Sequence, residues 1–315
     1  MSAHSSRPLL IARLTTALFA CSIATAQQPA SKPKTQPVEL DEVVIAAPKL
    51  SKGLLESAFS ATVADGKEIE ARGAQTLKDA SFTAPNTFFG EFAARKLSNP
   101  RFRGIGGYPS QGATVYYDNV PQFHANSSSL TLVDVDQVDF VRGPQAALFG
   151  RNTPGGLMSV TSRRPSMGAW SGTLETTHGN YNLRDYRGSI TGALVPETLG
   201  FSLAGGYNGR DGYTENTVTG NDVDWRRAWF GKMQFLWTPS KELEVRFILA
   251  GESARDGDYG LNDLAQLRAN PRRTQRNFEG FTNRDVLLPT LQITYHADAF
   301  DFTSTTGFVW WETTD

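Results

Sequence analysis

Residues 141–145 read VRGPQ and residues 148–156 read LFGRNTPGG, and these two turn-rich stretches decide the fold of the first half of the chain. Apolar runs of β-forming residues flank them, at 138–141 and 157–160. Glycine gives the backbone access to positive φ and proline lacks an amide donor, so such stretches end regular elements. The pattern predicts short strands joined by tight turns, in a compact α+β domain over residues 49–165.

The same domain carries signals for short helices nearer its start. Asp65 and Glu68 have the spacing of a capping box, which predicts a helix over about residues 67–72. A second helical turn is expected over residues 76–80. The aromatic stretch at 85–100 shows no regular period, so we expect it to be irregular.

Beyond residue 165, apolar and polar residues alternate with a period of two, which predicts antiparallel β-strands. Trp229 and Met233, for example, share one face of a strand, and Lys232 and Gln234 share the other. Each predicted strand is long enough to cross a bilayer while tilted, which needs about 9–11 residues. We expect about seven strands, near residues 170–178, 183–194, 199–207, 225–237, 243–249, 287–296 and 300–310.

The connections between these strands alternate in length. Short turns are predicted at 195–198, 238–242 and 297–299, and long loops at 208–224 and 253–285. This alternation is typical of a transmembrane β-barrel with periplasmic turns and extracellular loops. A soluble β-sandwich with a buried apolar face is the alternative.

The number of strands also matters. Seven strands in lipid would leave an unpaired sheet edge, where each unmet backbone group costs several kcal/mol. We therefore expect residues 166–315 to be the N-terminal part of a larger barrel that continues in a longer protein. No run of about 18 or more apolar residues follows the N-terminus, so no transmembrane helix is expected in the mature chain.

The N-terminus has the features of a secretory signal. Arg7 and Arg13 precede an apolar run at 14–24, and small residues follow at 24–26. This arrangement predicts a signal peptide over residues 1–26 that a signal peptidase removes. A short buried helix is the alternative.

Residues 27–48 join the signal to the first domain. Prolines among Lys, Gln and Ser residues cannot build a core, so the first part is expected to be an extended linker. An apolar, β-prone island follows. We expect it to add a strand to the exposed sheet edge of a partner protein, with an ordinary first strand of the next domain as the alternative. The island comprises Leu40, Asp41, Glu42, Val43, Val44, Ile45 and Ala46.

Composition excludes several functions. The chain has 31 Lys and Arg residues, 32 Asp and Glu residues and a net charge of −1, which provides no basic field for a nucleic acid. One Cys excludes an intramolecular disulfide and a multi-cysteine metal site. The stretch at 104–109 lacks the third glycine of a dinucleotide motif, and 150–157 lacks the Lys and Ser/Thr of a phosphate loop. We expect no enzymatic activity, no cofactor and no metal site.

Four blocks of the first domain, together with the island before it, resemble TonB-dependent outer-membrane receptors. The blocks are FRGIG at 102–106, YYDNVP at 116–121, VRGPQ at 141–145 and LFGRNTPGG at 148–156. The resemblance implies an α+β plug domain at 49–165, followed at 166–315 by part of an antiparallel transmembrane β-barrel. In such receptors a plug fills a barrel of about 22 strands.

The resemblance also implies a function and partners. The island at 40–46 would be a TonB box, through which TonB, with ExbB and ExbD, delivers energy from the inner membrane. The cargo would be a scarce ligand, most often a ferric siderophore, carried through outer-membrane lipid of a Gram-negative bacterium. Uptake of cobalamin, a saccharide or haem is an alternative, and a passive porin is another. Only residues 27–39 separate the expected cleavage site from the box, so no extra signalling domain is expected.

The resemblance assigns roles to individual residues as well. Arg103 and Arg142 match positions that hold the plug against barrel glutamates, for which Glu244 and Glu252 are inward-facing candidates. Ligand contacts are expected from three plug loops, whose mixture of aromatic and polar side chains suits a rigid organic ligand. These candidates are Phe88, Phe89, Tyr108, Ser110, Gln111, Phe123, His124 and Asn126.

Overall fold

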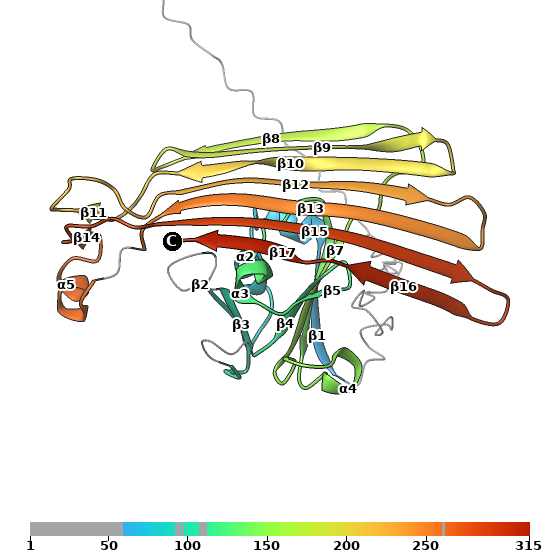
Figure 1. The fold of residues 1–315 in the computed structure, drawn as a ribbon, viewed down its shortest axis with the longest axis horizontal. Helices are drawn as coiled ribbons and strands as arrows, with labels where there is room; N and C mark the ends of the chain where they lie inside the picture. Colours follow the sequence, from blue (N-terminus) through green and yellow to red (C-terminus); the bar gives the residue numbers. More distant parts are fainter. Residues whose placement is uncertain (1–58, 92–94, 96–97, 107–111, 260–261) are drawn as a thin grey trace, which may run out of the picture. The chain divides into compact units, whose positions relative to one another are not determined.

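The computed structural model describes residues 59–91, 95, 98–106, 112–259 and 262–315, which belong to one compact unit of residues 42–315. The expected signal peptide, linker and TonB box lie outside the described residues. The described chain forms a small α+β domain followed by a large antiparallel sheet (Figure 1). None of its helices is long and apolar enough to span a bilayer.

Short strands and helices make up the small domain. In chain order they are β1 (Ser60–Asp65), α1 (Gly66–Ala71), α2 (Leu77–Ser81), β2 (Thr87–Glu91), β3 (Ser98–Phe102), β4 (Thr114–Tyr117), β5 (Val120–Gln122), α3 (Ala125–Ser128), β6 (Val135–Arg142), α4 (Ala146–Phe149) and β7 (Gly156–Ser162). Five strands form one sheet in the order β1-β6-β7-β4-β5. Its core includes the fully buried Leu77, Phe102, Phe140 and Met158.

The two helices near the start begin where side chains cap them. Asp65 accepts a hydrogen bond from the Glu68 amide (2.7 Å) at the start of α1. Gly73 follows this helix with φ of +62°, a left-handed conformation that glycine adopts without strain. Thr76 and Asp79 form a complete capping box for α2. Both predicted helices are confirmed, each shifted by one residue.

The expectation that residues 85–100 are irregular is wrong. β2 and β3 pair in antiparallel fashion, with Phe89 opposite Pro100. Phe89 is 2% exposed and belongs to the hydrophobic core. Gly90 and Pro100 obscure the strand pattern, because both residue types are rare inside strands. Packing of Phe89 therefore outweighs the weak local preference.

A tight turn joins β4 to β5. Asp118 and Asn119 have φ of +46° and +71°, as a type I′ hairpin turn requires. The Asp118 carboxylate also accepts hydrogen bonds from Ser162 N (2.8 Å) and Ser162 Oγ (2.7 Å). The turn is thereby tied to the end of β7.

The second part of the chain is one antiparallel sheet. Its strands are β8 (Ser171–Gly179), β9 (Leu183–Val195), β10 (Leu199–Arg210), β12 (Arg226–Trp237), β13 (Leu243–Gly257), β15 (Phe281–His296), β16 (Asp301–Gly307) and β17 (Trp310–Thr314). From β8 to β16 each strand pairs with the next one in this order, and β17 also pairs with β15. The predicted succession of antiparallel strands is confirmed.

The last predicted strand is interrupted. β16 and β17 continue one register along β15, from Gly307 opposite Thr290 to Trp310 opposite Leu287. Pro289 lies between these pairs on β15 and has no amide hydrogen to donate. The two segments are therefore halves of one strand, separated where the partner lacks a donor.

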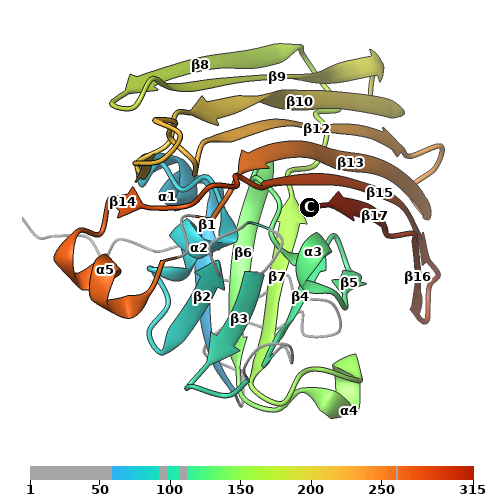
Figure 2. The ribbon, with the colours of Figure 1, turned by 60° about the vertical axis from the view of Figure 1, so that its left-hand side comes forward.

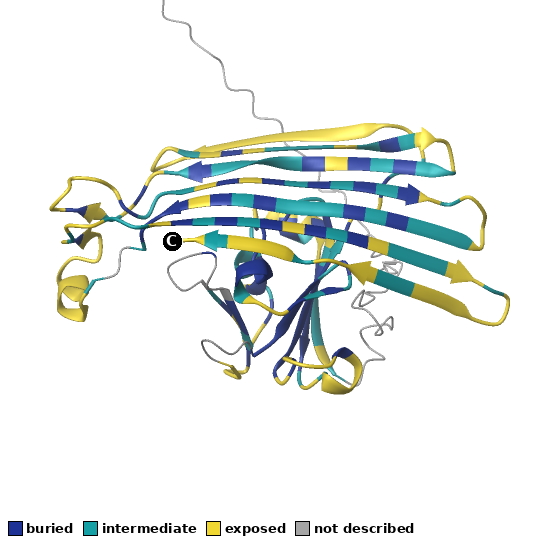
Figure 3. Ribbon diagram, in the orientation of Figure 1, coloured by how far each residue is buried: buried dark blue, intermediate teal, exposed yellow. Residues whose placement is uncertain are grey.

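The two faces of the sheet differ as predicted. On β12, Gln234 and Phe230 are 0% and 7% exposed, whereas Trp229 and Trp237 are 66% and 45% exposed. Buried residues alternate with intermediate or exposed ones along much of the central strands (Figure 3). A soluble β-sandwich would bury the apolar face, but here it is exposed. Other large apolar side chains exposed on the strands are Leu203, Leu287, Leu291, Tyr295 and Phe302.

The connections differ between the two ends of the sheet. At one end, residues 196–198, 238–242 and 297–300 form short turns. At the other end, residues 180–182 form a short turn as well, but the connections at 211–225 and 258–280 are longer. The predicted long loops are shortened because β10, β13 and β15 extend beyond their expected ends. The two long loops pair through short strands and one helix is added, namely β11 (Glu215–Asn216), β14 (Arg273–Thr274) and α5 (Leu264–Ala269).

Candidate functional site

The small domain contacts the inner face of the large sheet along one seam (Figure 2). We define the seam as residues 126–134 and 162–163 together with the inward side chains of β12, β13 and β15. Residues 129–134 lie between α3 and β6, outside the strands of the small domain. Their buried backbone groups need partners from elsewhere, and the large sheet supplies several of them.

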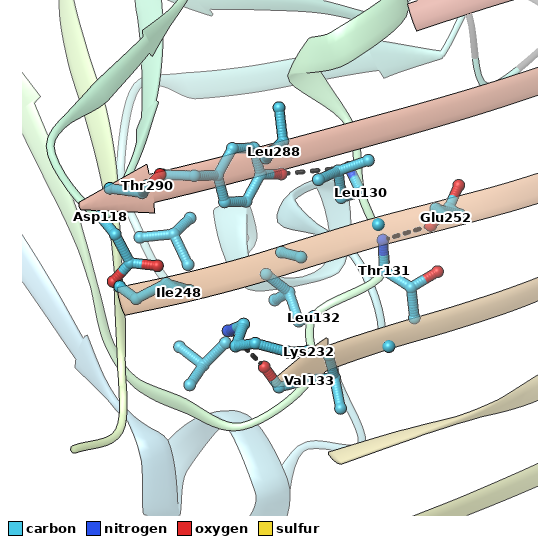
Figure 4. Close-up of a pocket in the computed structure, with 16 residues that line it drawn as sticks. Asp118, Leu130, Thr131, Leu132, Val133, Lys232, Ile248, Glu252, Leu288 and Thr290 are labelled. Atoms are coloured by element: carbon cyan, nitrogen blue, oxygen red, sulfur yellow. Dashed lines mark hydrogen bonds between the residues drawn. The ribbon is translucent and has the colours of Figure 1, made fainter. Parts of the chain in front are cut away.

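Lys232 of β12 anchors the middle of the seam. Its ammonium donates to Val133 O (2.7 Å) and Asp134 O (3.3 Å) (Figure 4). The residue is 7% exposed. A buried ammonium requires acceptors, so these carbonyls and Lys232 hold each other in place.

Arg246 of β13 binds the end of β7. Its Nη2 donates to Ser162 O (2.9 Å) and to Gln234 Oε1 (2.6 Å). Gln234 Nε2 in turn donates to Arg163 O (3.0 Å) and Asp134 Oδ2 (3.0 Å). The two side chains form one buried network that ends on groups of the small domain.

A buried ion pair continues the seam toward the long loops. Glu252 of β13 and Arg284 of β15 are paired, and each side chain is 1% exposed. Glu252 accepts a bond from Thr131 N (2.7 Å), which Figure 4 also shows. Arg284 donates to Ser129 O (2.8 Å) and Asn126 O (3.2 Å). The pair therefore ties two strands to the same segment of the small domain.

Apolar contacts complete the seam. Leu130 packs with Val286 and Leu288 against Tyr117. The Tyr117 hydroxyl accepts a bond from Leu130 N (3.1 Å), and burial raises the pKa of Tyr117, so the hydroxyl stays protonated. A cavity beside this cluster is lined in part by Leu132 (Figure 4).

Most hydrogen bonds of the seam run from side-chain donors of the sheet to main-chain acceptors of the small domain. Hydrogen bonds that involve a charged group contribute about 1.5–3 kcal/mol each. Within the described ranges, His, Cys, Asp and Glu side chains form no cluster that could hold a metal ion.

The structure places the two predicted arginines away from this seam. Arg142 donates to Ser60 Oγ (3.0 Å from Nε) and Thr62 Oγ1 (2.8 Å from Nη1), both on β1. Burial and the nearby charge of Arg103 lower the pKa of Arg142. Arg103 is exposed, with φ of +53°. The contacts shown for Arg142 thus lie inside the small domain.

The two glutamate candidates also have defined partners. Glu244 pairs with Arg164, and Glu252 pairs with Arg284. Both carboxylates face cations other than the predicted ones. Only Glu252 is buried.

The described candidates for ligand contact have different environments. Phe88 is 60% exposed, whereas Phe89 lies in the core and is not available to a ligand in this conformation. Phe123 is half-exposed, and the Arg151 guanidinium lies 4.2 Å from its ring centre. Tyr108, Ser110 and Gln111 lie outside the described residues.

His124 and Asn126 contact the large sheet. The His124 ring stacks on Trp311 of β17, with ring centres 4.4 Å apart. Asn126 Nδ2 donates to Thr313 Oγ1 (2.7 Å). His124 Nδ1 accepts the Asn126 amide (3.2 Å) and caps α3. These residues join the small domain to β17 in this structure.

The cations that carry the seam were not among the predicted site residues. Lys232 lies on the predicted polar face, so its orientation was predictable. Its acceptors are main-chain carbonyls, which every sequence has, so no motif marks them. Arg284 falls within a stretch that the sequence predicts to be a loop, and the extension of β15 brings it into the sheet.

Comparison with known proteins finds a family match and relatives for this chain. Residues 54–157 match the family described as TonB-dependent Receptor Plug Domain. The Ferrioxamine B receptor of Salmonella typhimurium is 29% identical over 167 residues, which cover 49% of this chain and 23% of the relative. The Pesticin receptor of Yersinia enterocolitica is 27% identical over 253 residues, which cover 76% of this chain and 34% of the relative. The chain thus spans only 23% and 34% of the length of these two relatives.

Solved structures share the fold. The ferric yersiniabactin uptake receptor FyuA from Yersinia pestis has a TM-score of 0.74 at 21% identity, covering 81% of this chain and 41% of that protein. The ferric citrate transporter FecA in its unliganded form has a TM-score of 0.68 at 16% identity, covering 82% of this chain and 41% of that protein. The chain thus contains a TonB-dependent receptor plug domain at 54–157, and the antiparallel strands that follow it have the fold of part of a receptor barrel.

Proposed function

We propose that the natural protein containing this chain is an outer-membrane receptor that takes up a ferric siderophore with energy supplied through TonB. The relatives named above as receptors for ferrioxamine B and pesticin support a receptor role. The observation that carries the proposal is the seam. It holds a plug against the polar face of a sheet whose other face is apolar and suited to lipid.

Opening such a plug requires work, because many of its main-chain groups are bonded to the sheet. The periplasm has no ATP pool, so the work has to come from the inner membrane through TonB, ExbB and ExbD. Residues 40–46 would form the TonB box and add a strand to TonB. A pull from there reaches β1, an edge strand that pairs only with β6 among the described strands.

Deletion of residues 40–45 tests the energy coupling. The variant is expected to lose uptake of a radiolabelled ferric siderophore while keeping its binding at the cell surface. Deletion of residues 31–36 in the linker is the matched control and should leave uptake intact. Equal uptake in the two deletion variants would refute the role of residues 40–46.

The cargo requires a separate test. Deletion of the gene is expected to slow growth under iron limitation and to abolish uptake of at least one ferric siderophore. Intact iron uptake with a loss of cobalamin, saccharide or haem uptake would overturn the siderophore assignment. Solute flux that persists after the proton-motive force is collapsed would indicate a passive porin instead.

A further inference from the structure

Three arginines lie in one row on the apolar, exposed face of the large sheet, at the end next to the long loops. Arg184 of β9, Arg227 of β12 and Arg255 of β13 are exposed. Gly209 of β10 is the register partner of both Arg184 and Arg227, and Arg227 is the partner of Arg255. Arg255 donates from Nη1 and Nη2 to the two carboxylate oxygens of Asp285 (3.0 Å each), which balances its charge. The other two arginines flank Gly209 and have different contacts.

Neutral groups hold Arg184 and Arg227 in place. Arg184 donates to Asn182 Oδ1 (3.0 Å from Nε and 2.8 Å from Nη2). The Arg227 guanidinium lies 4.9 Å from the centre of the Trp225 ring. An amide oxygen and an aromatic ring orient a guanidinium but carry no net charge. Each arginine thus keeps its positive charge and further N–H donors for a ligand.

A row of aromatic side chains lies next to the arginine row, two residues nearer the middle of the same strands. It consists of Tyr186 of β9, Tyr207 of β10 and Trp229 of β12, which are register partners. Tyr and Trp concentrate where a membrane protein meets the lipid head groups. At the turn end of these strands, the corresponding row of this face is apolar and consists of Val195, Leu199, Trp237 and Val245. We therefore expect the arginine row at the depth of the head groups on the loop side.

Gly209 leaves a gap between Arg184 and Arg227. A Cβ at Gly209 would lie 2.4 Å from Tyr207 Oη and 2.8 Å from Tyr207 Cζ. The Tyr207 ring therefore lies over Gly209, and its hydroxyl reaches the arginine row. The strands on either side of β10 are about 9–10 Å apart, so two long Arg side chains can reach a group between them. One phenol and two guanidinium groups are donors that suit the oxygens of a phosphate.

An open groove lies on the other side of the aromatic row. Gly188, Gly205 and Gly231 are register partners there, and they share the face of the aromatic row because side chains two residues apart on a strand point the same way. Ile190 and Leu203 also line the groove. These two side chains are 44% and 48% exposed. The groove is thus apolar and suits an acyl chain.

We infer that the gap at Gly209 binds the phosphate of one lipid in the loop-side leaflet, with Arg184, Tyr207 and Arg227 as the binding residues. An acyl chain of this lipid lies along the glycine groove. Charge complementarity identifies the occupant, because an uncharged head group offers the two guanidinium groups no anion. The inference rests on the proposed membrane location and is independent of the cargo.

Lipid binding to the full-length natural protein in detergent micelles tests the inference. The probes are dioleoyl phosphatidic acid and dioleoylglycerol, which have the same acyl chains and differ in the phosphate. Native mass spectrometry counts the lipids bound to each protein during a titration. We expect the wild type to bind one phosphatidic acid more tightly than any dioleoylglycerol, and we expect this preference to weaken as salt rises.

Variants locate the binding site. Arg184→Gln and Arg227→Gln are each expected to weaken binding of phosphatidic acid about fivefold, and the double variant about thirtyfold. Tyr207→Phe keeps both charges and should lose less than either single arginine variant. The double variant Lys241→Gln, Arg268→Gln removes two exposed cations elsewhere on the chain and is the matched control. Its binding of phosphatidic acid should stay within about twofold of the wild type.

Each outcome supports or overturns the inference. A preference for phosphatidic acid that is lost in the double arginine variant and kept in the control supports it. Equal binding of the two lipids by the wild type overturns it, and so does an equal loss in the arginine variant and the control. Inorganic phosphate that binds as tightly as phosphatidic acid would show that the site does not recognise a lipid. None of these measurements involves uptake, so the inference can fail while the proposed transport function stands.

Discussion

Arg284 and Glu252 form an ion pair on adjacent strands of the sheet, and both side chains are almost wholly removed from solvent. The same two residues hold the plug, since Arg284 donates to Ser129 O and Glu252 accepts Thr131 N. Desolvation makes each charge dependent on the other, because a buried charge without its partner is strongly destabilising. The plug segment between them therefore depends on two strands at once.

Removing one member of this pair should be costly. Arg284→Met is expected to reduce the free energy of unfolding by about 3–5 kcal/mol, because the buried Glu252 loses its paired cation. The double variant Glu252→Leu, Arg284→Met should lose less than the single one, since no unpaired charge remains. Urea unfolding in lipid vesicles measures both. An equal or greater loss in the double variant would contradict a dominant charge penalty.

Lys232 makes a second prediction about the seam. Lys232→Met leaves Val133 O without its donor, whereas Asp134 O keeps the Arg163 amide, and the loss is expected to cost about 1–3 kcal/mol. Hydrogen exchange should become faster for the plug segment at 129–135. Lys241→Met, in an exposed turn, removes the same charge without touching the plug and serves as the control. Unchanged exchange in the Lys232 variant would show that the carbonyls find other donors.

Two glycines in different surroundings give a matched comparison. Gly156 has φ of +138°, and a Cβ there would lie 2.0 Å from Val141 O and 2.8 Å from the Phe102 ring. Gly156→Ala is therefore expected to prevent folding of the plug or to destabilise it by more than about 3 kcal/mol. Gly73 also has positive φ, but nothing lies within 4 Å of the added atom. Gly73→Ala should cost only about 1 kcal/mol, and the temperature of plug unfolding compares the two variants.

Much of this fold was predictable, because local rules and packing agree in the strands. The alternation around Lys232 and Gln234 follows from the need to bury one face of β12 and expose the other. The capping of α1 by Asp65 is likewise a local hydrogen bond that the sequence specifies directly. Such features require no knowledge of distant residues.

The unpredicted features all depend on distant contacts. Phe89 is in a strand because its ring packs in the plug core, and no neighbouring residue in the sequence indicates this packing. The break opposite Pro289 becomes visible only when the register between β15 and β16 is known. The acceptors of Arg246 are carbonyls, so no side chain marks them.

His124 links the plug to the sheet by stacking on Trp311, and we expect the stability of this link to depend on pH. Its Nδ1 accepts the Asn126 amide, so the ring must be neutral at that nitrogen. Burial lowers the pKa of His124 in the folded protein below the ordinary value of about 6.5. The unfolded chain then binds a proton first as the pH falls. The contribution of His124 to stability is thus complete above about pH 6.5 and is lost as the pH falls through the folded-state value.

Hydrogen exchange of residues 124–128, corrected for the intrinsic effect of pH, measures this loss. We expect protection of the Asn126 amide to fall on acidification in the wild type. In His124→Asn the side-chain oxygen can still accept the Asn126 amide, because asparagine is a good helix cap, and it does not titrate. Protection in this variant should therefore be independent of pH over the same range. An equal fall in both proteins would show that a group other than His124 causes the pH dependence of protection. The variant removes only the imidazole that stacks on Trp311.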